Sequence, residues 1–255
     1  MVIVEKMHIA DIPLLHIVNQ SDKDHKTPMV LFIHGFTSAK ENNLHYAYYL
    51  AEKGIRVILP EALYHGERSK QYDTNELGMQ FWKIVLNEIE ELHTLKQYFE
   101  QKQLIDSNRI GVAGTSMGGI TTLGALTKYD WITAAVSLMG SPCYSTLLKG
   151  QLSSLQQSGV KIPLTSEQIE EQLKLLERYD LSLQREKLNN RPLLFWHGER
   201  DDVVPFAPTY QFYKEIVPMY EKEPNKLKFI ADPLADHKVS REGVLALVDW
   251  FVKYL

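Results

Sequence analysis

Residues 109–119 read Arg-Ile-Gly-Val-Ala-Gly-Thr-Ser-Met-Gly-Gly and contain the pattern G-x-S-x-G, centred on Ser116. A short apolar run precedes the serine, and a helical stretch at 120–128 follows it. This order predicts a strand, a tight turn and a helix, with the serine hydroxyl raised above the strand end. The residues two before and two after the serine must approach each other in such a turn, and both are glycine (Gly114 and Gly118). We therefore predict that Ser116 is a nucleophile rather than a serine that only caps the helix.

Outward from this turn, short apolar runs alternate with helical stretches along the chain. The runs lie at 29–34, 56–60, 109–113, 134–139, 192–196 and 227–230. Several are apolar on both faces, as expected of strands that helices cover on each side. The clearest helix is predicted at 76–100, where apolar residues recur at helical spacing. The alternation predicts an α/β fold with a mostly parallel central sheet and helices on both faces. The first twenty residues predict an antiparallel hairpin at the sheet edge.

One stretch interrupts this alternation. Residues 142–190 contain no convincing strand, although they include a helical piece at 166–179. A long excursion between core strands is usually functional. We therefore expect a single domain over 1–255, with 142–190 forming a helical lid or cap insertion. The alternative is a longer surface connection without a role at the site.

A serine hydroxyl needs a base to remove its proton, and the base needs an acid to orient it. After a strand-turn-helix nucleophile, the expected chain order is serine, acid, histidine. Only His197 and His237 follow Ser116. His197 stands at a strand end just before the acid candidates, too close in sequence to face them. His237, on a loop before the final helix, is therefore the predicted base.

Two neighbouring aspartates, Asp201 and Asp202, are candidates for the acid. We favour Asp201 because Asp202 then stands on the N-cap side of a helix opened by Pro205. Asp232 and Asp236 are weaker candidates, since both lie in the loop between the last strand and the histidine.

The developing negative charge on the substrate oxygen needs two backbone N–H donors. One is expected from Met117, the residue after the nucleophile. The other is expected from Phe36, in the loop that follows the strand at 29–34. Gly35 lets this loop pass close to the site, and the side chain of His34 is expected to brace the loop rather than to react.

Composition excludes several classes of protein. The 255-residue chain has a formal charge of −4, which argues against a nucleic-acid surface. It has one cysteine, Cys143, so it holds no internal disulfide and suits a reducing compartment. No segment approaches the uncharged length that a membrane span needs. Glu5 and Asp11 interrupt the first twenty residues, so we expect no signal peptide and a cytoplasmic protein.

Metal and thiol chemistry are not predicted. His65 lies near Glu67, but no third ligand of suitable spacing accompanies them. Nothing in the sequence around Cys143 would lower its pKa, and we expect it to be buried and inert. The expected site therefore uses no metal and no organic cofactor.

These motifs resemble the α/β-hydrolase superfamily, specifically its dienelactone-hydrolase and prolyl-oligopeptidase-like esterases. The resemblance spans nearly the whole chain and rests on 34–36, 114–119 and 197–201. Residues 60–69 are similar to the family loop written Arg-Gly-His-Gly-x-Ser, except that Leu63 and Tyr64 stand where Arg-Gly is common. The resemblance implies that Asp201 is the acid, and that the chain hydrolyses carboxylic esters without a cofactor.

The expected function is therefore that of a serine carboxylesterase acting on small, short-acyl ester substrates. Dienelactone hydrolases proper use a cysteine nucleophile, so Ser116 argues against that particular reaction. A thioesterase or acyltransferase would share the acyl-enzyme chemistry and stays open as an alternative. A peptidase is less favoured, because such relatives carry a gating domain for which the chain has no room. A non-catalytic binding module should lack a member of the triad, whereas all three are present.

Overall fold

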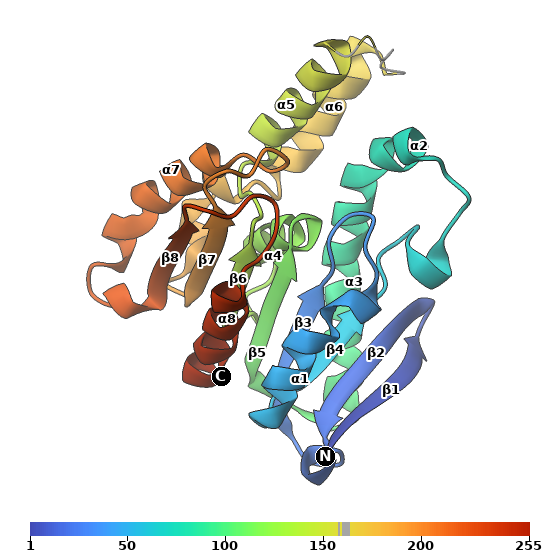
Figure 1. Ribbon diagram of the computed structural model, residues 1–255, viewed down its shortest axis with the longest axis vertical. Coiled ribbons are helices and arrows are strands. Elements are labelled where there is room, and N and C mark those ends of the chain that lie inside the picture. Colours follow the sequence, from blue (N-terminus) through green and yellow to red (C-terminus); the bar gives the residue numbers. More distant parts are fainter. Residues whose placement is uncertain (158, 160–163) are drawn as a thin grey trace.

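The computed structural model describes residues 1–157, 159 and 164–255, and its eight strands form one sheet in the order β1-β2-β4-β3-β5-β6-β7-β8 (Figure 1). Strands β1 and β2 pair antiparallel, as do β2 and β4, and the remaining pairs are parallel. The predicted edge hairpin and mostly parallel sheet are confirmed. The strands are β1 (Val2–Ile9), β2 (Ile12–Asn19), β3 (Thr27–Ile33), β4 (Arg56–Pro60), β5 (Ile105–Thr115), β6 (Ala134–Leu138), β7 (Leu193–Gly198) and β8 (Leu227–Asp232).

Helices cover both faces of this sheet, and each face has its own apolar core. Because side chains alternate along a strand, neighbouring residues of β3 enter different cores. Leu31 packs with residues of α3 and α4, whereas Val30 and Phe32 pack with residues of α1 and α8. The helices are α1 (Leu44–Glu52), α2 (Thr74–Met79), α3 (Phe81–Gln101), α4 (Met117–Lys128), α5 (Tyr144–Gln157), α6 (Ser166–Glu177), α7 (Phe206–Ile216) and α8 (Arg241–Tyr254).

The prediction of one continuous helix over 76–100 is wrong near its start. The chain forms two helices there, α2 and α3, which are separated at Gln80. Gly78 lies in the last turn of α2, where it disfavours a continuous helix. Asp73 caps α2 separately through a capping box with Glu76. Helix α2 buries none of its residues, whereas α3 buries an apolar face against the sheet.

The excursion between β6 and β7 is largely helical. Helices α5 and α6 pack against each other and extend beyond the end of the sheet at which the parallel strands finish (Figure 1). Residues 158 and 160–163 of the predicted 142–190 insertion lie outside the described residues. Helix α6 matches the predicted helical piece at 166–179 and begins with a capping box between Thr165 and Gln168.

Helices α5 and α6 are joined to the body of the protein by side-chain hydrogen bonds. Trp82 Nε1 of α3 donates to Gln151 Oε1 of α5 at 2.9 Å. Tyr179, just after α6, donates through its hydroxyl to Glu90 Oε1 of α3 at 3.3 Å. Both hydrogen bonds reach α3, and the hydroxyl of Thr127 in α4 donates a third, to Arg178 O at the end of α6, at 3.3 Å. None of the helices among residues 1–157 and 164–255 combines the length and apolar character needed to cross a bilayer.

Candidate active site

Ser116 sits in a strained turn between β5 and α4. Its φ of 54° and ψ of −115° place it in a region that residues with a side chain rarely adopt. The turn leaves no space for side chains on either side. A Cβ on Gly114 would lie 2.4 Å from the carbonyl carbon of Gly118, and a Cβ on Gly118 would lie 2.1 Å from Ile33 O. Both glycines are therefore needed for the turn that presents the serine.

The structure brings the three predicted catalytic side chains together. His237 Nε2 lies 2.8 Å from Ser116 Oγ, and His237 Nδ1 lies 2.7 Å from Asp201 Oδ2. Ser116 follows β5, Asp201 follows β7 and His237 follows β8, so all three stand at the carboxyl ends of parallel strands. A carboxylate can only accept, so Nδ1 carries the imidazole proton and Nε2 is free to accept from the serine.

Asp201 is held as a carboxylate by the groups around it. Its side chain is fully buried, and Oδ1 accepts the backbone N–H groups of Val203 at 3.0 Å and Val204 at 2.9 Å. Burial alone would raise the pKa of Asp201, but hydrogen bonds from His197, His237 and Val204 outweigh it and hold this pKa well below its usual range. The negative charge that orients His237 is thus fixed in place.

The prediction that His197 is too close in sequence to face the acid is wrong. His197 Nε2 lies 3.3 Å from Asp201 Oδ2 and 2.9 Å from Val204 O. The chain turns back just after Gly198. A Cβ on this glycine would lie 2.4 Å from Ala235 O. This turn brings residues four apart face to face, so His197 contacts the carboxylate that also binds His237. The signal in the sequence is the four-residue spacing of His197 and Asp201 across Gly198.

The other aspartates have different positions. Asp202 is exposed, and it does not cap α7, because Pro205 is the N-cap and no side chain bonds the helix start. Asp232 Oδ1 accepts the N–H groups of Leu234 and Ala235 and so shapes the loop that leads to the histidine. Asp236 is exposed.

Cys143 is half-buried rather than fully buried. Burial raises the pKa of its thiol to about 11, so the group stays protonated at neutral pH. This protonation state agrees with the inert role expected for Cys143.

The loop after β3 runs directly beside the nucleophile. A Cβ on Gly35 would lie 3.6 Å from Ser116 Cβ and 3.4 Å from Thr115 O. Phe36 is the next residue of this loop, and Met117 is the first residue of α4. The positive end of a helix dipole therefore also lies at the serine. Of the two residues predicted to supply oxyanion donors, Met117 follows Ser116 in the chain. Phe36 follows Gly35, which lies against the serine turn.

His34 braces the loop, as the sequence predicted. Its Nδ1 lies 2.8 Å from Gly35 O, and its Nε2 accepts the backbone N–H of Ala62 at 3.0 Å. The ring therefore links the loop after β3 to the loop after β4. The side chain is buried, and Nε2 also lies 3.4 Å from Glu61 Oε1, so His34 has a bracing position between the two loops.

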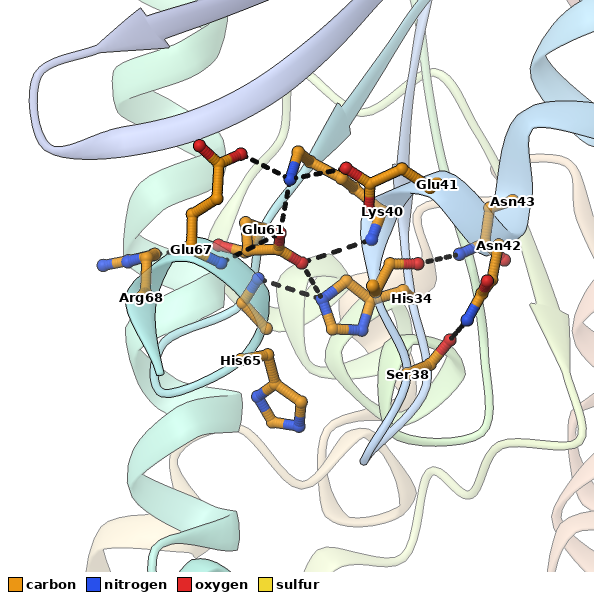
Figure 2. A network of polar contacts seen from close by, with 12 residues as sticks. His34, Ser38, Lys40, Glu41, Asn42, Asn43, Glu61, His65, Glu67 and Arg68 are labelled. Atoms are coloured by element: carbon orange, nitrogen blue, oxygen red, sulfur yellow. Dashed lines mark hydrogen bonds and ion pairs between the residues drawn. The ribbon is translucent and has the colours of Figure 1, made fainter. Parts of the chain in front are cut away.

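The buried ammonium group of Lys40 lies among three carboxylates close to His34 (Figure 2). The Nζ atom of Lys40 lies 2.9 Å from Glu41, 2.5 Å from Glu61 and 2.7 Å from Glu67. The three carboxylates are close enough to hold a metal ion, but the lysine ammonium already lies among them. Burial alone would raise the pKa of Glu61, but its contacts with His34 and Lys40 hold that pKa below its usual range. Glu61 also accepts the Lys40 backbone N–H at 3.2 Å.

Replacing Lys40 with methionine should lower the free energy of unfolding by about 3–5 kcal/mol, because it leaves the buried Glu61 carboxylate without its charged partner. Urea unfolding followed by circular dichroism measures the change. Lys174→Met is the matched control, since Lys174 pairs with Glu170 on an exposed face of α6. Equal free energies of unfolding for the two variants would show that Lys40 does not stabilise this loop.

The strand order, the strained serine turn and the acid and histidine beside it define a serine hydrolase with the α/β-hydrolase fold. The sequence model of the prolyl oligopeptidase family matches residues 42–255, and the chain belongs to this family.

Related proteins and structures agree with this assignment. The chain is 56% identical over the full length of both proteins to a Bacillus subtilis (strain 168) protein named "putative esterase YitV". It is 32% identical over 261 residues to Esterase YjfP of Escherichia coli (strain K12), again over the full length of both. The structure of TT1662 from Thermus thermophilus has the same fold, with a TM-score of 0.75 at 19% identity, covering 100% of this chain and 98% of that one.

Proposed function

We propose that this protein is a serine carboxylesterase that hydrolyses small esters with short acyl groups through an acyl-enzyme intermediate. The observation that carries the proposal is the continuous chain of contacts from Ser116 Oγ through His237 to Asp201, at 2.8 and 2.7 Å. The names of the two full-length relatives support ester hydrolysis as the reaction class.

In the first half of the proposed reaction, Ser116 Oγ attacks the ester carbonyl carbon while His237 Nε2 takes the hydroxyl proton. Asp201 stabilises the imidazolium that forms and keeps its proton on Nδ1. The tetrahedral intermediate then collapses, and His237 gives its proton to the departing alcohol. The products of this half are the free alcohol and an ester of Ser116.

In the second half, a water molecule attacks the acyl group as His237 again acts as base. The intermediate oxygen is negatively charged in both halves. We assign its stabilisation to the backbone N–H groups of Phe36 and Met117, since both residues flank the serine. Collapse of the second intermediate releases the carboxylic acid and restores the Ser116 hydroxyl.

Aromatic packing supports a small acyl site. The ring of Phe36 lies 5.5 Å from that of Phe81, which in turn lies 5.2 Å from the ring of Trp82. Through Trp82, this row is hydrogen-bonded to Gln151 of α5. We propose that residues 142–190 act as a lid that closes the site on the acyl side. A wall of packed rings is less adaptable than a flexible aliphatic one, which favours short acyl groups.

A panel of p-nitrophenyl esters from acetate to palmitate tests the substrate range. We expect kcat/KM to be highest for the shortest acyl groups and to fall by at least about tenfold by the octanoate, which corresponds to about 1.4 kcal/mol of lost transition-state stabilisation. Thioester and peptide substrates are measured beside the esters. Rising activity with chain length contradicts the short-acyl proposal, and faster turnover of thioesters or peptides contradicts the esterase assignment.

A further inference from the structure

His65 lies next to the proposed oxyanion loop and is not explained by the triad. Its side chain is buried, and both ring nitrogens face backbone groups. Nδ1 lies 2.9 Å from Leu63 O, and Nε2 lies 3.0 Å from Thr37 N. A carbonyl only accepts and an amide N–H only donates, so Nδ1 carries the proton and Nε2 is an acceptor. Burial lowers the pKa of His65, which favours this neutral form.

The residue that His65 binds, Thr37, has an unfavourable backbone conformation. Its φ is 61°, in the left-handed region that favours glycine. Thr37 is the third residue of a turn closed by the Ser38 N–H donating to Gly35 O at 3.1 Å. A positive φ at this place is typical of a type II turn, which usually has glycine there. A threonine in this conformation persists only where its surroundings hold it.

The same turn contains Phe36, whose amide is the proposed oxyanion donor. In a turn of this kind, the peptide between the second and third residues can rotate to give the alternative type I form. That peptide consists of the Phe36 carbonyl and the Thr37 N–H, so the hydrogen bond to His65 Nε2 selects its orientation. The Phe36 N–H belongs to the preceding peptide, and it is positioned by the placement of the turn as a whole. The ring of His65 also packs edge-on against the ring of Phe36, at 5.5 Å between centroids.

We propose that His65 is a positioning residue for the oxyanion hole. By accepting the Thr37 N–H and packing against the Phe36 ring, its neutral side chain fixes the position of the turn, and with it the Phe36 N–H that points toward the substrate oxygen. This inference rests on the proposed function, because only ester hydrolysis through Ser116 gives that amide its role. The geometry also accounts for His65 without a metal, since both ring nitrogens already have backbone partners.

Two variants separate positioning from packing. His65→Phe keeps a planar ring of similar size but removes the acceptor for Thr37, whereas His65→Gln can place an amide oxygen near the position of Nε2. Loss of one oxyanion donor costs about 10²–10³ in rate, and we expect misplacement of Phe36 in His65→Phe to lower kcat by about 10–10². KM for the same ester should stay within about threefold, because the substrate in its ground state carries little charge on that oxygen. His65→Gln should recover most of the lost kcat.

An inhibitor that mimics the tetrahedral intermediate provides an independent readout. A trifluoromethyl ketone forms a covalent adduct with an active-site serine and carries a negative oxygen in the oxyanion hole. Its affinity should fall in His65→Phe by the same factor as kcat/KM and should recover in His65→Gln. A merely structural role would predict the opposite order, because phenylalanine suits a buried site better than glutamine. Equal or higher kcat in His65→Phe than in His65→Gln would overturn the proposal.

His65→Asn covers the case in which His65→Phe does not fold. Its shorter amide can bond near Leu63 but does not reach Thr37, so its kcat should be below that of His65→Gln, and the reverse order overturns the proposal. Ester turnover and fluorophosphonate labelling of the unaltered protein are measured first. An unaltered protein that turns over no ester contradicts the proposed function and this inference together. Normal turnover with unchanged kcat in His65→Phe contradicts this inference alone.

Discussion

Replacement of Ser116 by alanine should lower kcat for the best ester substrate by about 10⁶-fold, because triad residues act as a unit and the loss of the nucleophile removes the whole pathway. The remaining rate should be the small acceleration that binding and the oxyanion donors give to attack by water. Steady-state kinetics with the preferred p-nitrophenyl ester measures this loss. A fluorophosphonate should add its mass to the peptide that contains Ser116 and should not label the variant.

Ser107→Ala is the matched control for this experiment. Ser107 lies on the same strand, β5, near its opposite end, and its hydroxyl donates to Glu100 at 2.5 Å. Because Ser107 is remote from the carboxyl ends of the strands, its replacement should leave kcat within about twofold, as expected for a surface substitution away from the site. Unchanged turnover in Ser116→Ala would refute the proposed mechanism, whatever the activity of the control.

Replacement of Asp201 by asparagine should lower kcat by about 10⁴-fold with little change in KM, as expected when the orienting acid of a triad is lost. The amide would present an N–H to His237 Nδ1 and so favour the tautomer whose Nε2 carries a proton and cannot accept from Ser116. The Oδ1 contacts to Val203 and Val204 can persist, so the loop should keep its shape. Circular dichroism and kcat measured on the same samples separate the two effects.

Asp202→Asn is the natural control, since the sequence left the two neighbours open as acids. Asp202 is exposed, and we expect its variant to retain full activity. A large loss in Asp202→Asn with normal activity in Asp201→Asn would reverse the assignment. The acid side of the pH profile should not report protonation of Asp201, because the pKa of this carboxyl is held well below its usual range.

The sequence predicted the features that depend on local pattern. The strand at 56–60 has the predicted bounds, because the apolar run that follows Arg56 ends at Pro60 and a loop. Ser116 was found from a motif whose glycines have a direct steric reason. His237 was found by elimination, since the chain order of a strand-turn-helix nucleophile leaves few histidines. These predictions needed only spacing along the chain.

Contacts that depend on how loops fold could not be predicted in this way. His197 reaches Asp201 because the chain reverses at Gly198, and spacing alone suggested the opposite. Lys40 meets Glu61 across 21 positions of sequence, where no periodic pattern links them. The sequence shows His65 only as a neighbour of Glu67, whereas its Nε2 accepts a backbone N–H 28 positions away. For Lys40 and His65, the deciding partner belongs to another loop.

Helices α5 and α6 leave the sheet after β6 and return to it at β7, and these two strands pair directly with each other. Whole helical turns could therefore be added or removed beyond the sheet without changing the register of any strand pair. Doubling the length of a flexible connection costs only about 0.6 kcal/mol in closure entropy. The size of this appendage can thus change while the residues around Ser116 stay fixed, so the proposed lid can differ among homologues without any change in the triad.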